Sequence, residues 1–270
     1  MKQFLAVSGA ALLLFVSLGD ASPLETRVVD GETAGRAQFP YQVTVTLKRH
    51  PLCGGVLVHE RFFLTAAHCF FKGETPVPVD DLNVFYGSEK LFSKGKYNRV
   101  KTVHFHDQYD QQSFRYDLAL VETRRSFEFS FTAQPVALAT EPLVEPSTVT
   151  VSGFGRTAEA GNTAFKLKYA QLTTLPADQC QHATGDGYYE GALCLDTTNG
   201  GGFCAGDYGG PAVFNETLVG VGSYTVGGRC EAGTPDVFVE VAHFSDWVQA
   251  TLDQDTAESE EKTEADSRHL

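Results

Sequence analysis

"CAGDYGGP", residues 204–211, is a glycine-rich turn with an acid at its centre in a chain that is otherwise rich in β-strand patterns. Glycine tolerates backbone conformations that other residues avoid and lets another chain segment approach closely. The neighbours of Tyr208 therefore suit a small side chain, yet the position holds one of the largest. The role of Tyr208 is the main question that the sequence raises.

Two further motifs place reactive side chains beside apolar strands. "LTAAHC" (64–69) puts His68 after a β-like run and next to Cys69, and "YDLALV" (116–121) puts Asp117 in front of an apolar strand. A carboxylate buried there needs a hydrogen-bonding partner. A single His or Asp at a strand end is more often structural than catalytic. The order His, Asp, Gly-Asp-x-Gly-Gly-Pro is far more specific than any one motif.

With this order of motifs the chain resembles the trypsin/chymotrypsin-like serine proteases (peptidase S1) over about residues 28–252. Other matching stretches are "RVVDG" (27–31), "CGG" (53–55), "SGFG" (152–155), "GSY" (222–224) and "TPDVFVEV" (234–241). The resemblance implies an all-β fold of two packed six-stranded antiparallel barrels, about 28–132 and 133–240, with a C-terminal helix at 241–252.

The residue patterns themselves favour an antiparallel sandwich or barrel. Short β-branched and aromatic runs are separated by Gly, Pro, Asn and Asp, which mark turns. Phe244, Trp247, Val248 and Leu252 recur at helical spacing and predict a single packing helix over 241–252. The predicted strands are 41–47, 82–86, 99–106, 118–122, 147–153, 217–223 and 236–241.

In the family that the chain resembles, a serine oxygen attacks the peptide carbonyl, a histidine takes its proton and a buried aspartate orients the histidine. By resemblance, His68 is the base, Asp117 the orienting acid and Ser223 the support of that acid. The backbone N–H groups of Gly206 and Tyr208 would form the oxyanion hole. The position of the nucleophile is occupied by Tyr208.

A tyrosine oxygen lies across a whole ring from the backbone, so Tyr208 cannot bring it to the near-attack position of a serine oxygen. We expect the ring to fill the space beside His68 that the scissile bond needs. The sequence therefore predicts a non-catalytic serine protease homologue. The alternative is an active serine endopeptidase, if Tyr208 is a sequence error or is bypassed. Tyrosine nucleophiles occur in some other hydrolases.

The specificity pocket also departs from the family pattern. Gly202 stands at its base, where trypsin-like members carry an acid, and Asp236 stands where a glycine usually keeps the pocket open. Asp236 could attract a Lys or Arg side chain, or bulky neighbours could close the pocket around an internal ion pair. We expect a narrowed pocket. The other pocket residues implied by the resemblance are Phe203, Tyr224 and Thr225.

Arg27–Val28 matches the activation cleavage site of the family, in which the freed amine pairs with the acid of the glycine-rich turn, here Asp207. Because a buried acid without a cation is costly, we expect cleavage to switch the conformation, although a relic propeptide of no consequence is the alternative. The segment 1–21 reads as a signal peptide, with Lys2 before an apolar run and a cleavage point near Ala21, and 22–27 as a short propeptide.

A secreted chain meets an oxidising environment, where its six cysteines favour three disulfides. Spacing alone allows fifteen pairings. The resemblance implies Cys53–Cys69, Cys180–Cys194 and Cys204–Cys230. Asn215 begins a glycosylation triplet, Asn-Glu-Thr. We expect no cofactor and no metal, with a surface loop favoured over a metal site for His104, His106 and Asp107.

The net charge of −13 argues against a nucleic-acid partner, because no concentrated basic segment could neutralise phosphates. Residues 253–270 carry seven acidic residues and are predicted to be a disordered acidic tail, either plainly solvated or a docking segment for a basic partner. We expect a secreted extracellular monomer, free of the membrane after signal removal. The expected partner is a protease, a protease inhibitor or a cascade component, against the alternative of an inert secreted protein.

Overall fold

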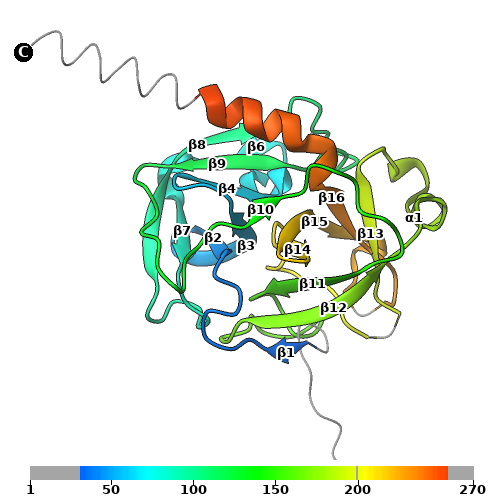
Figure 1. Ribbon diagram of the computed structural model, residues 1–270, viewed down its shortest axis with the longest axis horizontal. Helices are drawn as coiled ribbons and strands as arrows, with labels where there is room; N and C mark the ends of the chain where they lie inside the picture. Colours follow the sequence, from blue (N-terminus) through cyan, green and yellow to red (C-terminus); the bar gives the residue numbers. More distant parts are fainter. Residues whose placement is uncertain (1–30, 199, 231, 255–270) are drawn as a thin grey trace, which may run out of the picture.

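Six antiparallel strands close the first barrel of the protein. The computed structural model describes residues 31–198, 200–230 and 232–254, so the signal peptide, Arg27, Val28 and most of the acidic tail lie outside the described residues. The barrel order is β2-β3-β4-β9-β8-β7 (Figure 1). Its strands are β2 (Gln42–Leu47), β3 (His50–Leu57), β4 (Phe62–Thr65), β7 (Leu82–Tyr86), β8 (Lys96–Phe105) and β9 (Ala119–Thr123), with a small hairpin β5 (Phe71–Lys72) and β6 (Thr75–Pro76).

The second barrel also has six antiparallel strands. Their order is β12-β11-β14-β15-β16-β13, and the additional pairing of β13 with β12 closes the ring. The expected pair of six-stranded barrels is confirmed. The strands are β11 (Thr148–Gly153), β12 (Lys168–Thr174), β13 (Ala192–Asp196), β14 (Pro211–Phe214), β15 (Thr217–Thr225) and β16 (Asp236–Glu240).

Two short strands join the second barrel, and only the first of them departs from the expected division of the chain at residue 132. β1 (Glu32–Thr33) pairs with β12, so the described start of the chain extends the second barrel rather than the first. β10 (Ala137–Leu138) runs parallel to β15. β1 thus joins the segment that precedes the first barrel to the second barrel, and β10 does the same for the segment that follows it.

Helical structure is sparse. The predicted C-terminal helix begins as a 3₁₀ turn, Val241–Phe244, and continues as an α-helix through 245–254, slightly beyond the predicted end (Figure 1). The sequence analysis missed a second helix, α1 (Ala177–Thr184), which carries Cys180. The other 3₁₀ turns are Ala67–Phe70, Val79–Asp81, Gly185–Gly187 and Val226–Gly228.

Apolar side chains fill each barrel and the boundary between them. Phe63 and Val121 belong to the first core, and Phe238 and Val151 to the core of the second barrel. A third cluster lies between the barrels and includes Leu120, Val239 and Val248 of the C-terminal helix, with Trp247 packed against it. Burial of this scale is the main stabilising term of a domain. Among the described residues no helix is long and apolar enough to span a membrane.

All three implied disulfides are formed: Cys53–Cys69, Cys180–Cys194 and Cys204–Cys230. The bridged cysteines are 16, 14 and 26 residues apart, and each such loop contributes about 3 kcal/mol by the chain-entropy argument. The first bridge holds the turn that carries His68. The third holds the glycine-rich turn that carries Tyr208.

Candidate functional site

Strand pairing in the first barrel brings His68 and Asp117 together. β4 pairs antiparallel with β9, with Thr65 opposite Ala119. The 3₁₀ turn that follows β4 therefore lies beside the residues that precede β9. His68 Nδ1 is 2.7 Å from Asp117 Oδ2, and the His68 backbone N–H donates to Asp117 Oδ1 over 2.8 Å. Residues 49 positions apart in sequence thus form one polar unit.

The Asp117 carboxylate is completely buried and fully supplied with donors. Besides the two groups of His68, the Ser223 hydroxyl donates to Asp117 Oδ2 over 2.5 Å. A buried carboxylate needs such partners. When Nδ1 is the donor to the carboxylate, Nε2 is the acceptor nitrogen of the ring, and it lies 3.8 Å from the disulfide sulfur of Cys69. The three residues that the sequence assigned to a base and its support are brought together.

The glycine-rich turn packs tightly against the first barrel. Gly209 has φ of 83°, and a Cβ there would lie 2.1 Å from Thr65 Oγ1 and 2.6 Å from the Gly54 carbonyl oxygen. Only glycine fits that approach. The N–H groups of Asp207 and Gly209 donate to carbonyls of Cys204 and Gly222. Among the described residues, no backbone hydrogen bond is formed by the N–H groups of Gly206 and Tyr208, the two groups that the resemblance assigns to an oxyanion hole.

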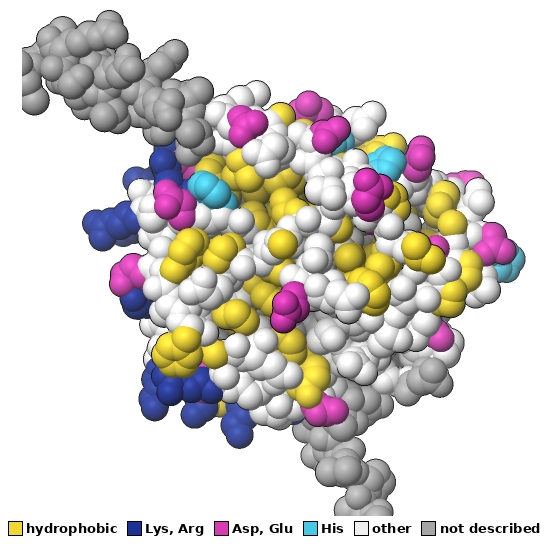
Figure 2. Space-filling view, in the orientation of Figure 1, with side chains coloured by type: hydrophobic (Ala, Val, Ile, Leu, Met, Phe, Trp, Pro, Cys, Tyr) yellow, Lys and Arg dark blue, Asp and Glu magenta, His cyan; other side chains and the backbone are white. Residues whose placement is uncertain are grey.

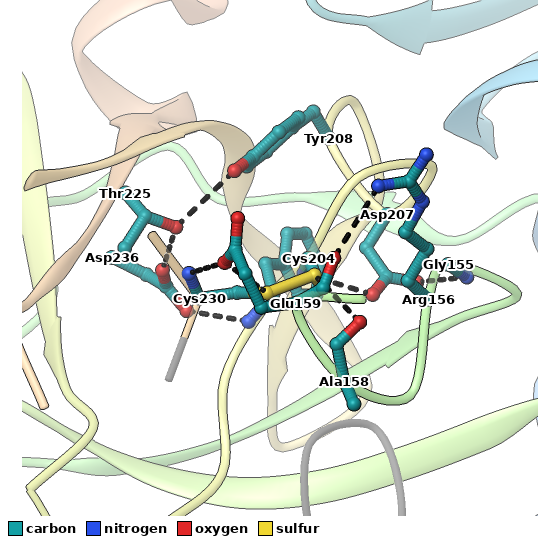
Figure 3. The surroundings of a disulfide bond; sticks show 11 residues. Gly155, Arg156, Ala158, Glu159, Cys204, Asp207, Tyr208, Thr225, Cys230 and Asp236 are labelled. Carbon is teal, nitrogen blue, oxygen red and sulfur yellow. Dashed lines mark hydrogen bonds between the residues drawn. A yellow bond between two sulfur atoms is a disulfide. The ribbon is translucent and has the colours of Figure 1, made fainter. Parts of the chain in front are cut away.

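The Tyr208 side chain packs beside His68 and reaches Thr225 with its hydroxyl. Its ring packs edge-on against the imidazole, with 5.8 Å between the ring centroids. Its hydroxyl lies 3.3 Å from Thr225 Oγ1 rather than on His68 (Figure 3). Since Thr225 Oγ1 donates to Asp236 Oδ1 over 2.6 Å, the phenol donates to Thr225. The ring is beside His68, as expected, and the hydroxyl lies further into the pocket than the sequence indicated.

The surroundings of Tyr208 keep its phenol protonated. Burial raises the pKa of Tyr208, a hydrogen bond that Thr225 would donate to the phenolate lowers it, and the nearby carboxylates of Asp236, Asp207 and Glu159 raise it again. The net shift is upward from a value already near 10. A neutral phenol whose proton is held in a hydrogen bond to Thr225 is a poor nucleophile.

Asp236 lies next to Thr225, beyond the Tyr208 hydroxyl, and is 1% exposed. Its carboxylate accepts hydrogen bonds from Thr225 Oγ1 and from the Phe203 N–H, which is 2.5 Å away. The expected alternative of an internal ion pair is therefore wrong for the described residues, because a hydroxyl and an amide take the place of a cation. Burial raises the pKa of Asp236 to about 7. A Cβ at Gly202 would lie 2.7 Å from Asp236 Oδ2, so this glycine makes room for the carboxylate.

The expected pocket residue Phe203 has a different place. Its ring is 1% exposed and packs against Phe238, 4.8 Å between centroids, in the second core. Its backbone N–H donates to Asp236 Oδ2 over 2.5 Å, so the backbone and the side chain of Phe203 serve different surroundings.

An aromatic rim that the sequence analysis missed borders the histidine. Phe114 packs edge-on against His68, with 5.5 Å between centroids, and lies 5.9 Å from the Tyr224 ring. Phe114 has φ of 55°, which is uncommon for a bulky residue. The only signal for it in the sequence is its position three residues before Asp117.

Asp207 is the third buried carboxylate of the site. Its oxygens accept hydrogen bonds from the N–H groups of Gly155 at 2.6 Å and Cys204 at 3.1 Å. Burial raises its pKa to about 7, the two amides lower it, and Asp236 raises it further. A Cβ on Gly153 or Gly155 would collide with this carboxylate, so both glycines shape its niche. The acid is thus set to accept a cation without yet having one among the described residues.

Two other expectations concern the surface. Asn215 lies in an exposed turn between β14 and β15, where a glycan is sterically possible. His106 packs against Phe244 and Trp247 at 5.0 and 5.2 Å, which uses its ring in the helix contact. In the described parts of the chain, the groups close enough to share an ion are Cys53–His68–Cys69 and Glu159–Cys204–Cys230. Their sulfurs are already paired as disulfides, which leaves no thiolate ligand.

Comparison with known proteins decides the family. The sequence model of the Trypsin family matches residues 28–248. The chain belongs to the trypsin family. It is 36% identical to serine protease SP24D of Anopheles gambiae over 84% of this chain and 81% of that one. It is 33% identical to trypsin 5G1 of Aedes aegypti, over 88% and 93%.

A solved structure of the trypsin fold shows the same arrangement. Neuropsin, described as a serine protease expressed in the limbic system of mouse brain, superposes with a TM-score of 0.75 at 26% identity. The alignment covers 83% of this chain and 99% of that one. The trypsin-family match contains every residue of the site described above, and residues 249–270 lie outside it.

Proposed function

We propose that this chain is a secreted trypsin-family protein that does not cleave peptides and uses its folded surface to bind other proteins. The observation that carries the proposal is the path of Tyr208, whose ring stands beside His68 and whose hydroxyl hydrogen-bonds Thr225. The same side chain removes the nucleophile and fills the entrance to the pocket.

Acyl transfer in this family needs an oxygen that can attack a carbonyl carbon while the histidine takes its proton. In this chain the only hydroxyl at the nucleophile position points to Thr225, and its raised pKa opposes deprotonation. Loss of the nucleophile in a related template costs on the order of 10⁶ in turnover. The remaining parts, His68, Asp117 and the two N–H groups, cannot supply that step.

The alternative, an active serine endopeptidase, is favoured by one observation. His68 and Ser223 both hydrogen-bond the Asp117 carboxylate, which leaves Nε2 of His68 on the side away from that carboxylate. The two candidates separate in a hydrolysis assay on a broad peptide library, with protein cleaved after Arg27. We expect no turnover; turnover that disappears in the His68→Ala variant would overturn the inactive assignment.

Secretion and activation are part of the proposal. Three disulfides are typical of proteins in oxidising compartments, in keeping with residues 1–21 as a signal peptide. Cleavage after Arg27 would free the Val28 amine, and Asp207 is the buried acid that would receive it. Hydrogen exchange of the intact and cleaved forms tests this switch, with stronger protection expected around Asp207 after cleavage and no difference expected if the propeptide is a relic.

The partner is proposed to be a protein: a protease, a protease inhibitor or another component of a protease cascade. The retained fold, the blocked pocket and the absence of a nucleophile fit a protein that offers a protease-like surface without consuming its partner. A pull-down from the source fluid identifies that partner. Failure to enrich any protein above the level seen with a control bait of similar net charge would favour an inert secreted protein.

A further inference from the structure

Basic side chains gather on one edge of the first barrel although the whole chain carries a net charge of −13. Figure 2 shows Lys and Arg side chains concentrated on this edge, at the left of the view, while acidic side chains are scattered over the remaining face. The edge holds a hollow of about 530 Å³, which we call the basic groove. It is lined by Arg49, Asp80, Asn83, Tyr97, Asn98, Arg99, Arg124 and Arg125.

Two strands, β7 and β8, and three connecting segments build the basic groove. Asn83 of β7 pairs with Arg99 of β8, and Arg124 follows β9 and donates its N–H to the Arg99 carbonyl. Arg49 comes from the tip of the β2–β3 hairpin and lies over the Tyr97 ring at 5.6 Å. The four arginines converge because these strands are neighbours in the closed barrel.

Most of the positive charge in the groove is not neutralised locally. Asp80, its one acidic lining residue, pairs with Arg124 over 2.7 Å. Within the described chain, Arg49, Arg99 and Arg125 have no carboxylate partner, and all three are exposed. Guanidinium groups bind carboxylates through paired hydrogen bonds, so a cluster of this kind fits an acidic polypeptide.

The chain itself supplies such a polypeptide. Residues 255–270 hold six acidic residues, Asp255, Glu258, Glu260, Glu261, Glu264 and Asp266, against Lys262 and Arg268. In sequence this segment follows both barrels and the trypsin-family match, and its composition predicted either a solvated tail or a docking segment for a basic partner.

The segment is long enough to reach the groove. The described chain ends on the first-barrel side, at the end of the C-terminal helix (Figure 1). Trp247 of that helix contacts His106, which directly follows β8. Arg99 lies on the same strand, roughly 23 Å from His106 at about 3.3 Å per residue. A flexible chain of this length has a root-mean-square span of roughly 22 Å and an extended reach of roughly 53 Å.

We propose that the acidic segment 255–270 binds the basic groove of its own chain. Arg49, Arg99 and Arg125 pair with carboxylates of the segment, while Arg124 stays with Asp80. Because the tether gives an effective concentration in the mM range, modest affinity suffices for occupancy. The segment then shields the groove from acidic partners, which must displace it.

The test uses the full chain with a competing peptide. A fluorescent peptide of residues 255–270 is titrated into wild-type protein and into a full-length variant whose six tail acids are changed to Asn or Gln. We expect the tail-neutralised variant to bind the peptide about tenfold more tightly or better, because its groove is no longer occupied from within. Equal affinity for both proteins would overturn the proposal.

Charge reversal locates the binding site. In the tail-neutralised variant, the double substitution Arg99→Glu and Arg125→Glu should weaken peptide binding about tenfold or more. The matched control is the double substitution Lys166→Glu and Arg229→Glu. Both control residues are exposed and lie outside the groove, so peptide binding should not change. Equal loss in both pairs would exclude the groove as the site. Thermal melts check that every variant remains folded.

Two further readings complete the test. Raising the salt concentration from about 0.1 to about 1 M, which shortens the Debye length from roughly 10 to 3 Å, should weaken peptide binding strongly. Sedimentation should show a wild-type monomer at every concentration. A dimer that disappears when the tail is neutralised would place the segment in a second copy and would overturn binding within one chain.

Discussion

The two halves of the site, one from each barrel, differ in what they preserve. The first barrel supplies His68 and Asp117, and the second supplies Ser223, which completes their network of hydrogen bonds. The glycine-rich turn of the second barrel packs against the first barrel and carries Tyr208, whose hydroxyl hydrogen-bonds Thr225. Under the proposed function, a backbone frame and a base in place do not by themselves give the reaction. The proposal puts the loss at a single oxygen, whose position is set by side-chain length.

The same comparison applies to the three buried carboxylates. Asp117 accepts from three donors, including an imidazole. Asp207 and Asp236 accept only from neutral amides and a hydroxyl, and burial raises the pKa of each to about 7. In the base half of the site (His68, Asp117 and Ser223), the buried carboxylate is therefore supplied with donors. In the pocket half (Asp207 and Asp236), the raised pKa values favour the neutral acids below about pH 7.

The largest expected effect on stability concerns Phe203, which supports the pocket from the core. The Phe203→Ala variant removes a fully buried ring that packs against Phe238 and leaves a cavity. We expect a loss of about 3–5 kcal/mol in the free energy of unfolding. Urea denaturation measures it. A loss below about 1 kcal/mol would show that the ring is not part of the core.

Ser223 tests the base half. The Ser223→Ala variant removes the 2.5 Å hydrogen bond to the buried Asp117 carboxylate. A hydrogen bond to a charged group is worth about 1.5–3 kcal/mol, so the variant should lose that much stability. The exposed Ser126→Ala variant is the matched control and should be neutral. Equal stability of both variants would mean that Asp117 does not depend on Ser223.

The pH dependence of stability tests the pocket half. Because the pKa values of Asp207 and Asp236 are raised in the folded protein to about 7, the folded state binds more protons than the unfolded state between about pH 4 and pH 7. Their stabilising contribution is complete below pH 4 and is lost as the pH rises through 7. For one carboxyl the loss between pH 5 and pH 7 is about 2 kcal/mol.

Denaturation at several pH values measures this loss in protein not cleaved after Arg27. The Asp207→Asn and Asp236→Asn variants should each flatten the decline relative to wild type. Cleavage should flatten the part due to Asp207, because a buried ammonium group would lower the pKa of that acid. Wild-type stability that rises from pH 5 to pH 7 would contradict the assignment.

The smallest expected effect concerns the Tyr208 hydroxyl. The Tyr208→Phe variant keeps the ring beside His68 and removes only the 3.3 Å hydrogen bond with Thr225. We expect a change of about 1 kcal/mol or less in unfolding free energy. Basic ligands such as benzamidine should still be excluded, because the ring blocks the pocket. Binding of benzamidine by this variant would show that the hydroxyl, and not the ring, closes it.

Much of the fold and of the site could be predicted from sequence because the signals are local. Alternating strands such as 41–47 and the motifs around His68, Asp117 and Tyr208 lie in short continuous stretches. Helix α1 was missed because its one buried residue, Cys180, gives no apolar stripe. The C-terminal helix was recognised by such a stripe, which includes Val248.

The positions of the side chains around Tyr208 could not be predicted from such local signals. The sequence places Tyr208 beside His68. The position of its hydroxyl, however, depends on the side-chain rotamer and on the space that Thr225 and Asp236 leave. Phe203 was assigned to the pocket, although its side chain turns into the core. The choice between an ion pair and hydrogen bonds for Asp236 depends on a partner, the Phe203 amide, that no residue type reveals.

The central claim is that the base half is competent and that Tyr208 alone removes the reaction. The most direct test is labelling by a serine-directed fluorophosphonate, followed by mass spectrometry of the adduct in protein cleaved after Arg27. We predict no adduct on wild type, an adduct at position 208 in the Tyr208→Ser variant, and none when His68→Ala is added. An adduct on wild-type protein, or an inert Tyr208→Ser variant that is correctly folded, would contradict this account.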